Sequence, residues 1–180
     1  EILGKMKRKY TIHQFKEIVE KFRRYVPDIT IATDMIVGFP TETELQFQDS
    51  LHLIQEMKPD VLNIARFSPR PNTVAARIHG QVQSNIKKER SRAITELFNS
   101  IALKQNTRWI GWQGKIVIDE IGKNNTWIGR NFAYKPVIVK GNFNLGDEVD
   151  VKIKEVTAYD LRANVIDVPE IEVNVEKNFT

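Results

Sequence analysis

Apolar residues recur at helical spacing in three segments of the chain. The first spans residues 12–26 and ends at Pro27, the second spans residues 43–57, and the third spans residues 84–106. The first two segments follow a threonine that has a glutamine three residues later, which is the spacing of a capping box. The pattern therefore predicts three helices, two of them with a defined start.

Two short runs rich in β-branched residues separate these helices. They span residues 29–37 and 61–67, and their composition predicts buried strands. The order helix, strand, helix, strand is typical of parallel strands joined by crossover helices. We therefore expect an α/β unit over residues 1–107.

After Gly111 the pattern changes to short alternating segments separated by glycine and asparagine turns. These segments lie at residues 114–120, 126–129, 136–140, 148–156 and 161–168. Five short strands in succession predict a small antiparallel, OB-like barrel. The expected fold class is thus α/β plus all-β, with the barrel over residues 108–168 and a tail over residues 169–180.

Composition narrows the classes of protein that the chain can represent. The sequence contains no cysteine, which excludes disulfides, cysteine nucleophiles and any iron–sulfur cluster held by this chain alone. It also fits a cytoplasmic protein, and no apolar run approaches the roughly 18 residues of a membrane span. The net charge of +4 permits a nucleic-acid partner without requiring one. Because the first residue is Glu1 rather than methionine, we expect a piece of a longer protein.

The first candidate for chemistry is the end of the strand predicted over residues 29–37. Asp34 lies inside this strand, and Gly38 and Phe39 open the turn into the next helix. In α/β folds, ligands bind beyond the carboxyl ends of the strands, and a glycine there lets backbone approach a ligand. The alternative is that Asp34 is a structurally satisfied acid and that the turn is only a turn.

Two loops add further candidates. Residues 66–73 end the next strand with two arginines and two prolines, a rigid cationic loop suited to an anionic ligand or else a solvated turn. Residues 127–136 interleave aromatic and basic side chains, as RNA-binding loops do, although Trp127 and Phe132 could equally be core residues. The three histidines show no metal-ligand spacing.

Four motifs occur in order along the chain: MKRKYT at residues 6–11, TDMIVGFPTET at residues 33–43, RFSPRPNTVAA at residues 66–76 and GRNFAYKPV at residues 129–137. Together they resemble the radical S-adenosylmethionine methylthiotransferases that modify tRNA, in particular the archaeal and eukaryotic branch that acts on N6-threonylcarbamoyladenosine. Thr41 and Asn72 depart from the family, which usually has glycine at both positions. The resemblance implies the C-terminal portion of a partial (β/α) radical SAM barrel followed by an RNA-binding TRAM barrel.

The resemblance also implies an activity for the whole protein: addition of a methylthio group to C2 of the modified adenosine. Its cofactors would be S-adenosylmethionine and two [4Fe–4S] clusters, whose cysteines lie upstream of this chain in the family. We therefore expect the 180 residues alone to be inactive and to hold no metal. The expected partners are tRNA and the missing N-terminal part of the same protein, with self-association possible through uncovered strand edges.

Individual residues carry over from the matching motifs. The candidates for facing the cofactor or substrate are Asp34, Gly38, Phe39, Phe67, Ser68 and Arg70. The candidates for binding tRNA are Arg130, Asn131, Tyr134, Lys135, Lys7 and Arg8. Two other hypotheses remain: a free-standing RNA-binding module with a non-catalytic α/β scaffold, and a phosphate-ligand α/β protein with an unrelated barrel.

Overall fold

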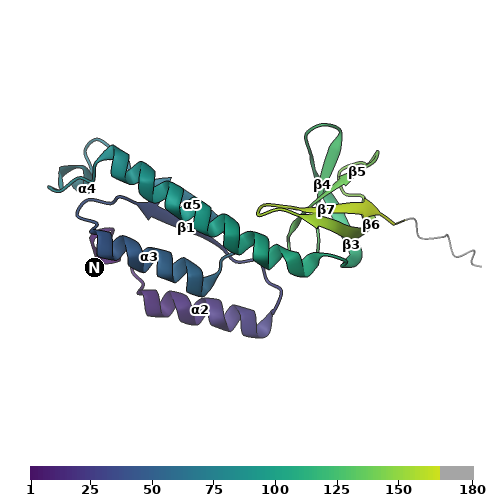
Figure 1. The fold of residues 1–180 in the computed structure, drawn as a ribbon, viewed down its shortest axis with the longest axis horizontal. Helices are drawn as coiled ribbons and strands as arrows, with labels where there is room; N and C mark the ends of the chain where they lie inside the picture. Colours follow the sequence, from purple (N-terminus) through teal and green to yellow (C-terminus); the bar gives the residue numbers. More distant parts are fainter. Residues whose placement is uncertain (167–180) are drawn as a thin grey trace, which may run out of the picture.

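The computed structural model describes residues 1–166, which form an α/β part and a β-barrel placed end to end (Figure 1). The α/β part consists of α1 (Ile2–Lys5), α2 (Ile12–Tyr25), β1 (Ala32–Val37), α3 (Glu44–Met57), β2 (Val61–Arg66), α4 (Val74–Arg77) and α5 (Ser84–Asn106). The three predicted helices are confirmed as α2, α3 and α5, and both capping boxes are formed. None of the helices in this range is long and apolar enough to cross a membrane. The predicted tail over residues 169–180 lies outside the described residues.

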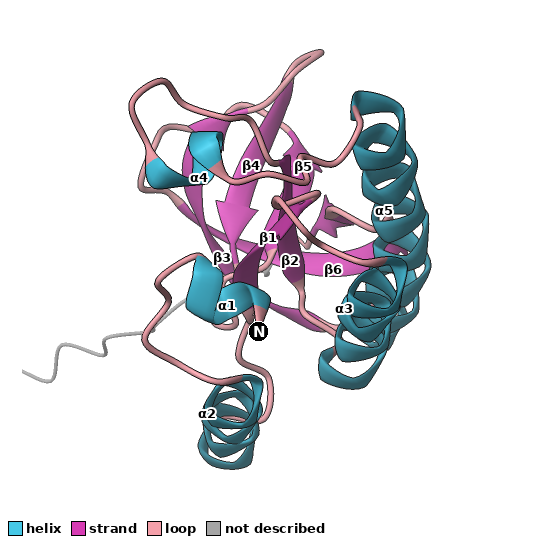
Figure 2. Ribbon diagram, turned by 90° about the vertical axis from the view of Figure 1, so that its left-hand side faces the viewer, coloured by secondary structure: helices cyan, strands magenta, loops and turns pink. Residues whose placement is uncertain are grey.

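The two strands of the α/β part pair in parallel, as predicted. Their register runs from Ala32 opposite Val61 to Val37 opposite Arg66. Helices α3 and α5 lie together on one side of this sheet (Figure 2). The core between them consists of Val37, Phe47, Ile54, Leu62, Ile94, Phe98 and Ala102. Two strands do not close a (β/α) barrel, so the larger barrel implied by the family resemblance is not shown by residues 1–166.

The other side of the sheet is largely exposed. Alternation along the strands places one set of side chains there, which we call the open face: Ala32, Asp34, Ile36, Val61, Asn63 and Ala65. All of these except Ile36 are exposed. Parallel sheets are ordinarily covered on both faces, so a half-covered pair of strands is unusual.

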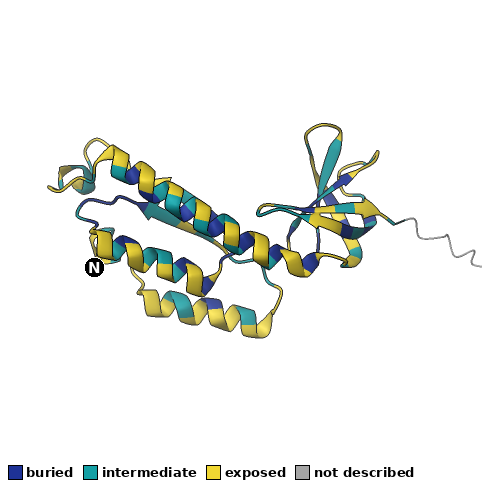
Figure 3. Cartoon of the chain, in the orientation of Figure 1, coloured by how far each residue is buried: buried dark blue, intermediate teal, exposed yellow. Residues whose placement is uncertain are grey.

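The apolar side of helix α2 is also largely exposed. Its apolar residues follow the helical period, yet only Val19 is buried, and Ile18 and Phe22 are 52% and 51% exposed. Figure 3 shows α2 with much of its surface exposed. The helix contacts the end of α3 through polar groups: Lys16 pairs with Glu56, and Arg23 donates to the carbonyl of Met57. Burial of an amphipathic face is the main source of helix stability in proteins, so this face is suited to packing against further protein.

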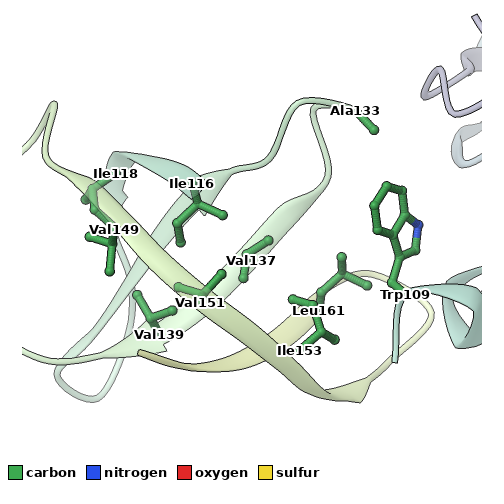
Figure 4. Close-up of a cluster of buried hydrophobic side chains, with 10 residues drawn as sticks. All are labelled: Trp109, Ile116, Ile118, Ala133, Val137, Val139, Val149, Val151, Ile153 and Leu161. Carbon is green, nitrogen blue, oxygen red and sulfur yellow. The ribbon is translucent and has the colours of Figure 1, made fainter. Parts of the chain in front are cut away.

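The barrel follows a short 3₁₀ helix, Thr107–Trp109. Its strands are β3 (Gln113–Ile121), β4 (Thr126–Arg130), β5 (Pro136–Lys140), β6 (Glu148–Val156) and β7 (Leu161–Val165). The interior is filled mainly by β-branched and leucine side chains from β3, β5, β6 and β7 (Figure 4), and Trp127 of β4 packs against them. The barrel prediction is therefore confirmed in number and approximate position of the strands.

The prediction of an all-antiparallel barrel was wrong in one place. The strand order is β3-β4-β5-β7-β6, closed by pairing of β3 with β6. Strands β5 and β6 follow each other in the chain but are not neighbours in the barrel. Strand β7 lies between them and pairs with β5 in parallel. An alternating pattern of apolar and polar residues predicts where strands lie but not which strands are neighbours, because the strand order depends on how the barrel closes.

Candidate functional site

The turn after β1 is held by a buried network of charged groups. The backbone N–H of Gly38 donates to Glu42 Oε2 over 2.7 Å, and Arg90 Nη1 of α5 donates to the same oxygen over 2.6 Å. The side chains of Glu42 and Arg90 are 5% and 7% exposed. A second branch links Arg90 Nη2 to Glu44 over 3.1 Å. A hydrogen bond from Gln48, together with Arg90, holds the pKa of the Glu44 carboxyl below its usual value.

Gly38 leaves room for a side chain of α5, which the sequence did not indicate. Its φ of +73° lies in the left-handed region, and a Cβ built there would approach Lys87 Cγ to 2.4 Å. The Lys87 ammonium then donates to the carbonyl of Phe67 at the end of β2, over 3.0 Å. The space above Gly38, where we expected a ligand to approach, is filled by the Lys87 side chain in this structure.

Substitution of Gly38 by alanine is expected to destabilise the chain by about 1.5–3 kcal/mol more than the same change at Gly146, since only Gly38→Ala disturbs the charged hydrogen bond of Lys87. Gly146 is the matched control because its φ is +93° but a Cβ there meets nothing within 4 Å. Both changes share the left-handed backbone cost. Urea unfolding followed by circular dichroism measures the difference, and equal losses would contradict the proposed role of Lys87.

The other cofactor candidates divide between the surface and the core. Asp34 is exposed on the open face, where it accepts a hydrogen bond from Asn63 Nδ2 over 2.9 Å, so the strand buries no lone carboxylate. Ser68 and Arg70 are exposed in the loop after β2. Phe39 and Phe67 meet edge to face, with ring centroids 5.1 Å apart, and Phe39 is 4% exposed. Asn63 carries no motif and was missed by sequence reasoning, because only the strand register brings it to Asp34.

A cavity of about 400 Å³ lies beside β1, between α2 and α3. Its lining includes Arg8, Asp34 and Asp49, together with the apolar residues Met6 and Phe15. The structure thus brings Arg8, a predicted RNA contact, to the same cavity as Asp34, a predicted cofactor contact. Lys7 is exposed beside it, with a φ of +56°.

The residues present do not fit an iron–sulfur cluster. The chain has no cysteine, and residues 1–166 contain no group of three or more His, Cys, Asp or Glu side chains that could hold a metal ion. Such clusters need thiolate ligands. No chemical step that depends on a cluster is therefore assigned to the residues of this chain.

The loop of the barrel from residue 130 to residue 135 places the RNA candidates in two different environments. Tyr134 is 69% exposed, and the Arg130 guanidinium lies over its ring at 5.2 Å from the centroid. Arg130 Nε also donates to Asp119 over 2.9 Å. Asn131 is buried, and its side-chain oxygen accepts hydrogen bonds from the backbone N–H groups of Ala133 and Lys135. Arg130 and Tyr134 can therefore meet a ligand, whereas Asn131 shapes the loop.

Lys135 joins the barrel to the α/β part. Its ammonium donates to Asp60 Oδ1 over 2.7 Å and to Asn106 Oδ1 over 3.1 Å, and the side chains of Lys135 and Asp60 are 4% and 2% exposed. Asp60 Oδ2 accepts from the backbone N–H of Ile31, and Asn106 Nδ2 donates to the carbonyl of Thr157. Lys135, which we expected to face tRNA, is buried in this structure, and Asp60 neutralises its charge.

Comparison with known proteins first identifies the type of domain that the barrel forms. Residues 115–166 match the family model described as the TRAM domain. The match covers the barrel from β3 to the last described residue. The five-stranded barrel is thus a TRAM domain, carried beside a partly covered α/β part.

The most informative relatives share more than this domain. The chain is 44% identical over 154 residues to the probable threonylcarbamoyladenosine tRNA methylthiotransferase of Archaeoglobus fulgidus. The aligned region covers 86% of the chain and 36% of the relative. Proteins of the same name from Pyrococcus horikoshii and Methanocaldococcus jannaschii are 42% and 38% identical, over 79% and 92% of the chain and 34% and 37% of their own lengths. The chain therefore spans little more than a third of these relatives. These matches confirm the predicted family: the chain corresponds to its TRAM-containing, C-terminal portion.

Proposed function

We propose that the chain is the tRNA-binding C-terminal part of a methylthiotransferase that modifies N6-threonylcarbamoyladenosine. One observation carries the proposal: the 44% identity to the Archaeoglobus fulgidus protein extends over 86% of the chain, so it includes both the barrel and the α/β part. The buried pair Lys135–Asp60 fixes these two parts to each other. An RNA held by the barrel is thereby kept in one position relative to the open face.

The reaction of the whole enzyme would add a methylthio group to C2 of the adenine. S-adenosylmethionine and two [4Fe–4S] clusters would supply the radical and sulfur chemistry, with the cluster cysteines provided outside these 180 residues. The exposed polar groups Asp34, Asn63, Ser68 and Arg70 fit the binding of a polar nucleoside or its anionic groups near the carboxyl end of the sheet. Their role in this proposal is to bind and orient.

The remainder of the protein would cover the open face, the free edge of β1 and the apolar side of α2. Within residues 1–166, these surfaces are an uncovered face of a parallel sheet, a strand edge that pairs with no other strand, and an exposed hydrophobic stripe. The cavity of about 400 Å³ lies at the same place. The relatives have enough additional chain to supply this cover, since roughly two thirds of their length lies outside the match.

A chimeric enzyme tests the reaction. Residues 1–166 would replace the matching portion of the Archaeoglobus fulgidus relative, and the purified chimera would be incubated with tRNA that carries threonylcarbamoyladenosine. Mass spectrometry of the digested tRNA is expected to show the methylthio product, which is absent when the matching portion is deleted. A folded, tRNA-binding chimera that forms no product would favour the free-standing RNA-binding module instead.

Binding of the full chain to an anticodon stem-loop, measured by fluorescence anisotropy, tests the RNA grip. Affinity is expected to fall as salt rises, because each neutralised phosphate releases counterions. Arg130→Ala is expected to weaken binding, because it removes the guanidinium that lies over the exposed Tyr134 ring. Arg162→Ala is the control, since Arg162 is also a partly exposed barrel arginine paired with acidic neighbours. Equal effects of the two substitutions would remove Arg130 from the interface.

A further inference from the structure

A cleft of about 370 Å³ separates the barrel from the α/β part. One wall comes from the residues before β1 and from the start of the strands, including Val26, Thr30 and Val61; the other comes from the barrel loop, including Arg130, Phe132 and Tyr134. We call this space the interdomain cleft. Its volume lies in the range of pockets that hold small ligands.

The walls of the interdomain cleft are fixed before any ligand arrives. Lys135 and Asp60 form their buried ion pair between the same two parts, and the Thr30 hydroxyl donates to the carbonyl of Ala133 across the cleft. A preformed cleft requires little ordering on binding, so more of the interaction energy remains as affinity.

The lining of the cleft is aromatic and apolar. Phe132 and Tyr134 are each 69% exposed, and Val26 and Val61 on the opposite wall are 50% and 40% exposed. The Arg130 guanidinium over the Tyr134 ring extends the flat surface with a cation. Exposed rings of this kind, backed by arginine, are the platforms on which unpaired bases stack.

The charges around the cleft favour a base over a phosphate group. Asp28 belongs to the lining, and Asp119 and Glu120 lie 2.9 Å and 3.9 Å from Arg130. Asp119 and Glu120 lie outside the lining and offset the charge of Arg130, whereas the Asp28 carboxylate repels a phosphate and can accept a hydrogen bond from an amino or ring N–H group of a base. The occupant that suits both the flat apolar walls and the acidic rim is therefore a neutral aromatic ring with N–H donors at its edge.

We propose that the interdomain cleft binds one unpaired nucleobase of the RNA, stacked on Tyr134 and enclosed by the α/β wall at Val61. This inference rests on the proposed function, since it assumes that the barrel grips RNA. Ala32 and Val61 both line the cleft and form the first register pair of the open face, and Asp34 and Asn63 follow two residues along the strands, about 7 Å away. A base in the cleft therefore anchors the RNA strand at one end of the open face.

The test uses anticodon stem-loops in which 2-aminopurine replaces one loop base at a time. Stacking quenches its emission, so the full chain is expected to quench one loop position strongly. Tyr134→Ala is expected to abolish that quenching and to weaken binding roughly 5- to 150-fold, the usual loss for one stacked base. Tyr159→Ala is the control, since Tyr159 is a barrel tyrosine that is 62% exposed but lies outside the cleft.

The substitution Val61→Trp distinguishes binding of a base in the cleft from binding of RNA by the barrel alone. The larger side chain occupies the cleft from the α/β wall and leaves the residues of the barrel loop unchanged, so loss of the quenching would support the proposal. Unchanged quenching with Val61→Trp, or no quenched position although the RNA binds, would overturn it and leave the proposed function intact. If the wild-type chain binds no RNA, the RNA grip in the proposed function fails as well. Thermal unfolding of each variant checks that the fold is kept.

Discussion

Replacing Asp60 by alanine is expected to destabilise the chain by about 3–5 kcal/mol, because it leaves the Lys135 ammonium buried without its counter-charge. The side chains of both residues are at most 4% exposed, and the pair is 2.7 Å apart. Urea unfolding followed by circular dichroism measures the loss. Tryptophan fluorescence adds a signal from the barrel, because Trp109, Trp112 and Trp127 all pack against its core.

Glu148→Ala is the matched control for Asp60. Glu148 also forms an ion pair between neighbouring segments, with Lys115 over 3.1 Å, but both side chains are more than 60% exposed. Water screens such pairs, so we expect no clear change in stability. The double variant Asp60→Asn with Lys135→Met, which removes both charges, should recover part of the loss. If Asp60→Ala behaved like Glu148→Ala, the joint would not be a buried ion pair.

The second large effect is expected at the turn after β1. Glu42→Ala should cost about 3–5 kcal/mol, since it removes the buried carboxylate paired with the Arg90 guanidinium and also the acceptor of the Gly38 N–H, and leaves Arg90 with the exposed Glu44 carboxylate and the carbonyl of residue 42. Arg90 Nε already has no hydrogen-bond partner within residues 1–166, so the substitution further reduces the pairing of a guanidinium that is incompletely satisfied. The same urea titration gives the measurement.

Glu44→Ala provides the internal comparison for this second prediction. Glu44 pairs with the same arginine, over 3.1 Å, but its side chain is 65% exposed. Loss of its carboxylate leaves Glu42 in place, and we expect a much smaller change. Comparable losses from Glu42→Ala and Glu44→Ala would show that Arg90 is held by both carboxylates equally.

The sequence predicted best those features that depend on near neighbours. The helix expected over residues 84–106 has those limits as α5, and the capping boxes at Thr11 and Thr43 form as their spacing indicated. These features rest on hydrogen bonds and apolar contacts within a few residues, which a single sequence displays. The strands were located less sharply: residues 29–37 were predicted, and β1 spans Ala32–Val37.

The features that sequence reasoning missed depend on residues that are far apart. Lys135 sits among polar and aromatic residues and was expected at the surface, but its partner Asp60 is 75 positions earlier in the chain. Gly38 was expected to face a ligand, whereas the space beside it is filled by the side chain of Lys87, which comes from α5. Similarly, the parallel pairing of β5 with β7 follows from closure of the barrel. In each case the deciding contact has no local pattern.

Helix α5 links the two buried ion networks directly, and this constrains any attempt to move the TRAM barrel onto another scaffold. Its 23 residues span about 34 Å, with Lys87 and Arg90 near one end and Asn106, which contacts Lys135 and Thr157, as its last residue. One residue inserted between Arg90 and Asn106 would turn the two ends by about 100° relative to each other and separate them by about 1.5 Å. Even an insertion of two full turns, which restores the angle, would carry the barrel about 10 Å away from Asp60. A functional graft must therefore keep the number of residues between these two positions and the core residues Ile94, Phe98 and Ala102, whereas the exposed positions between them can vary.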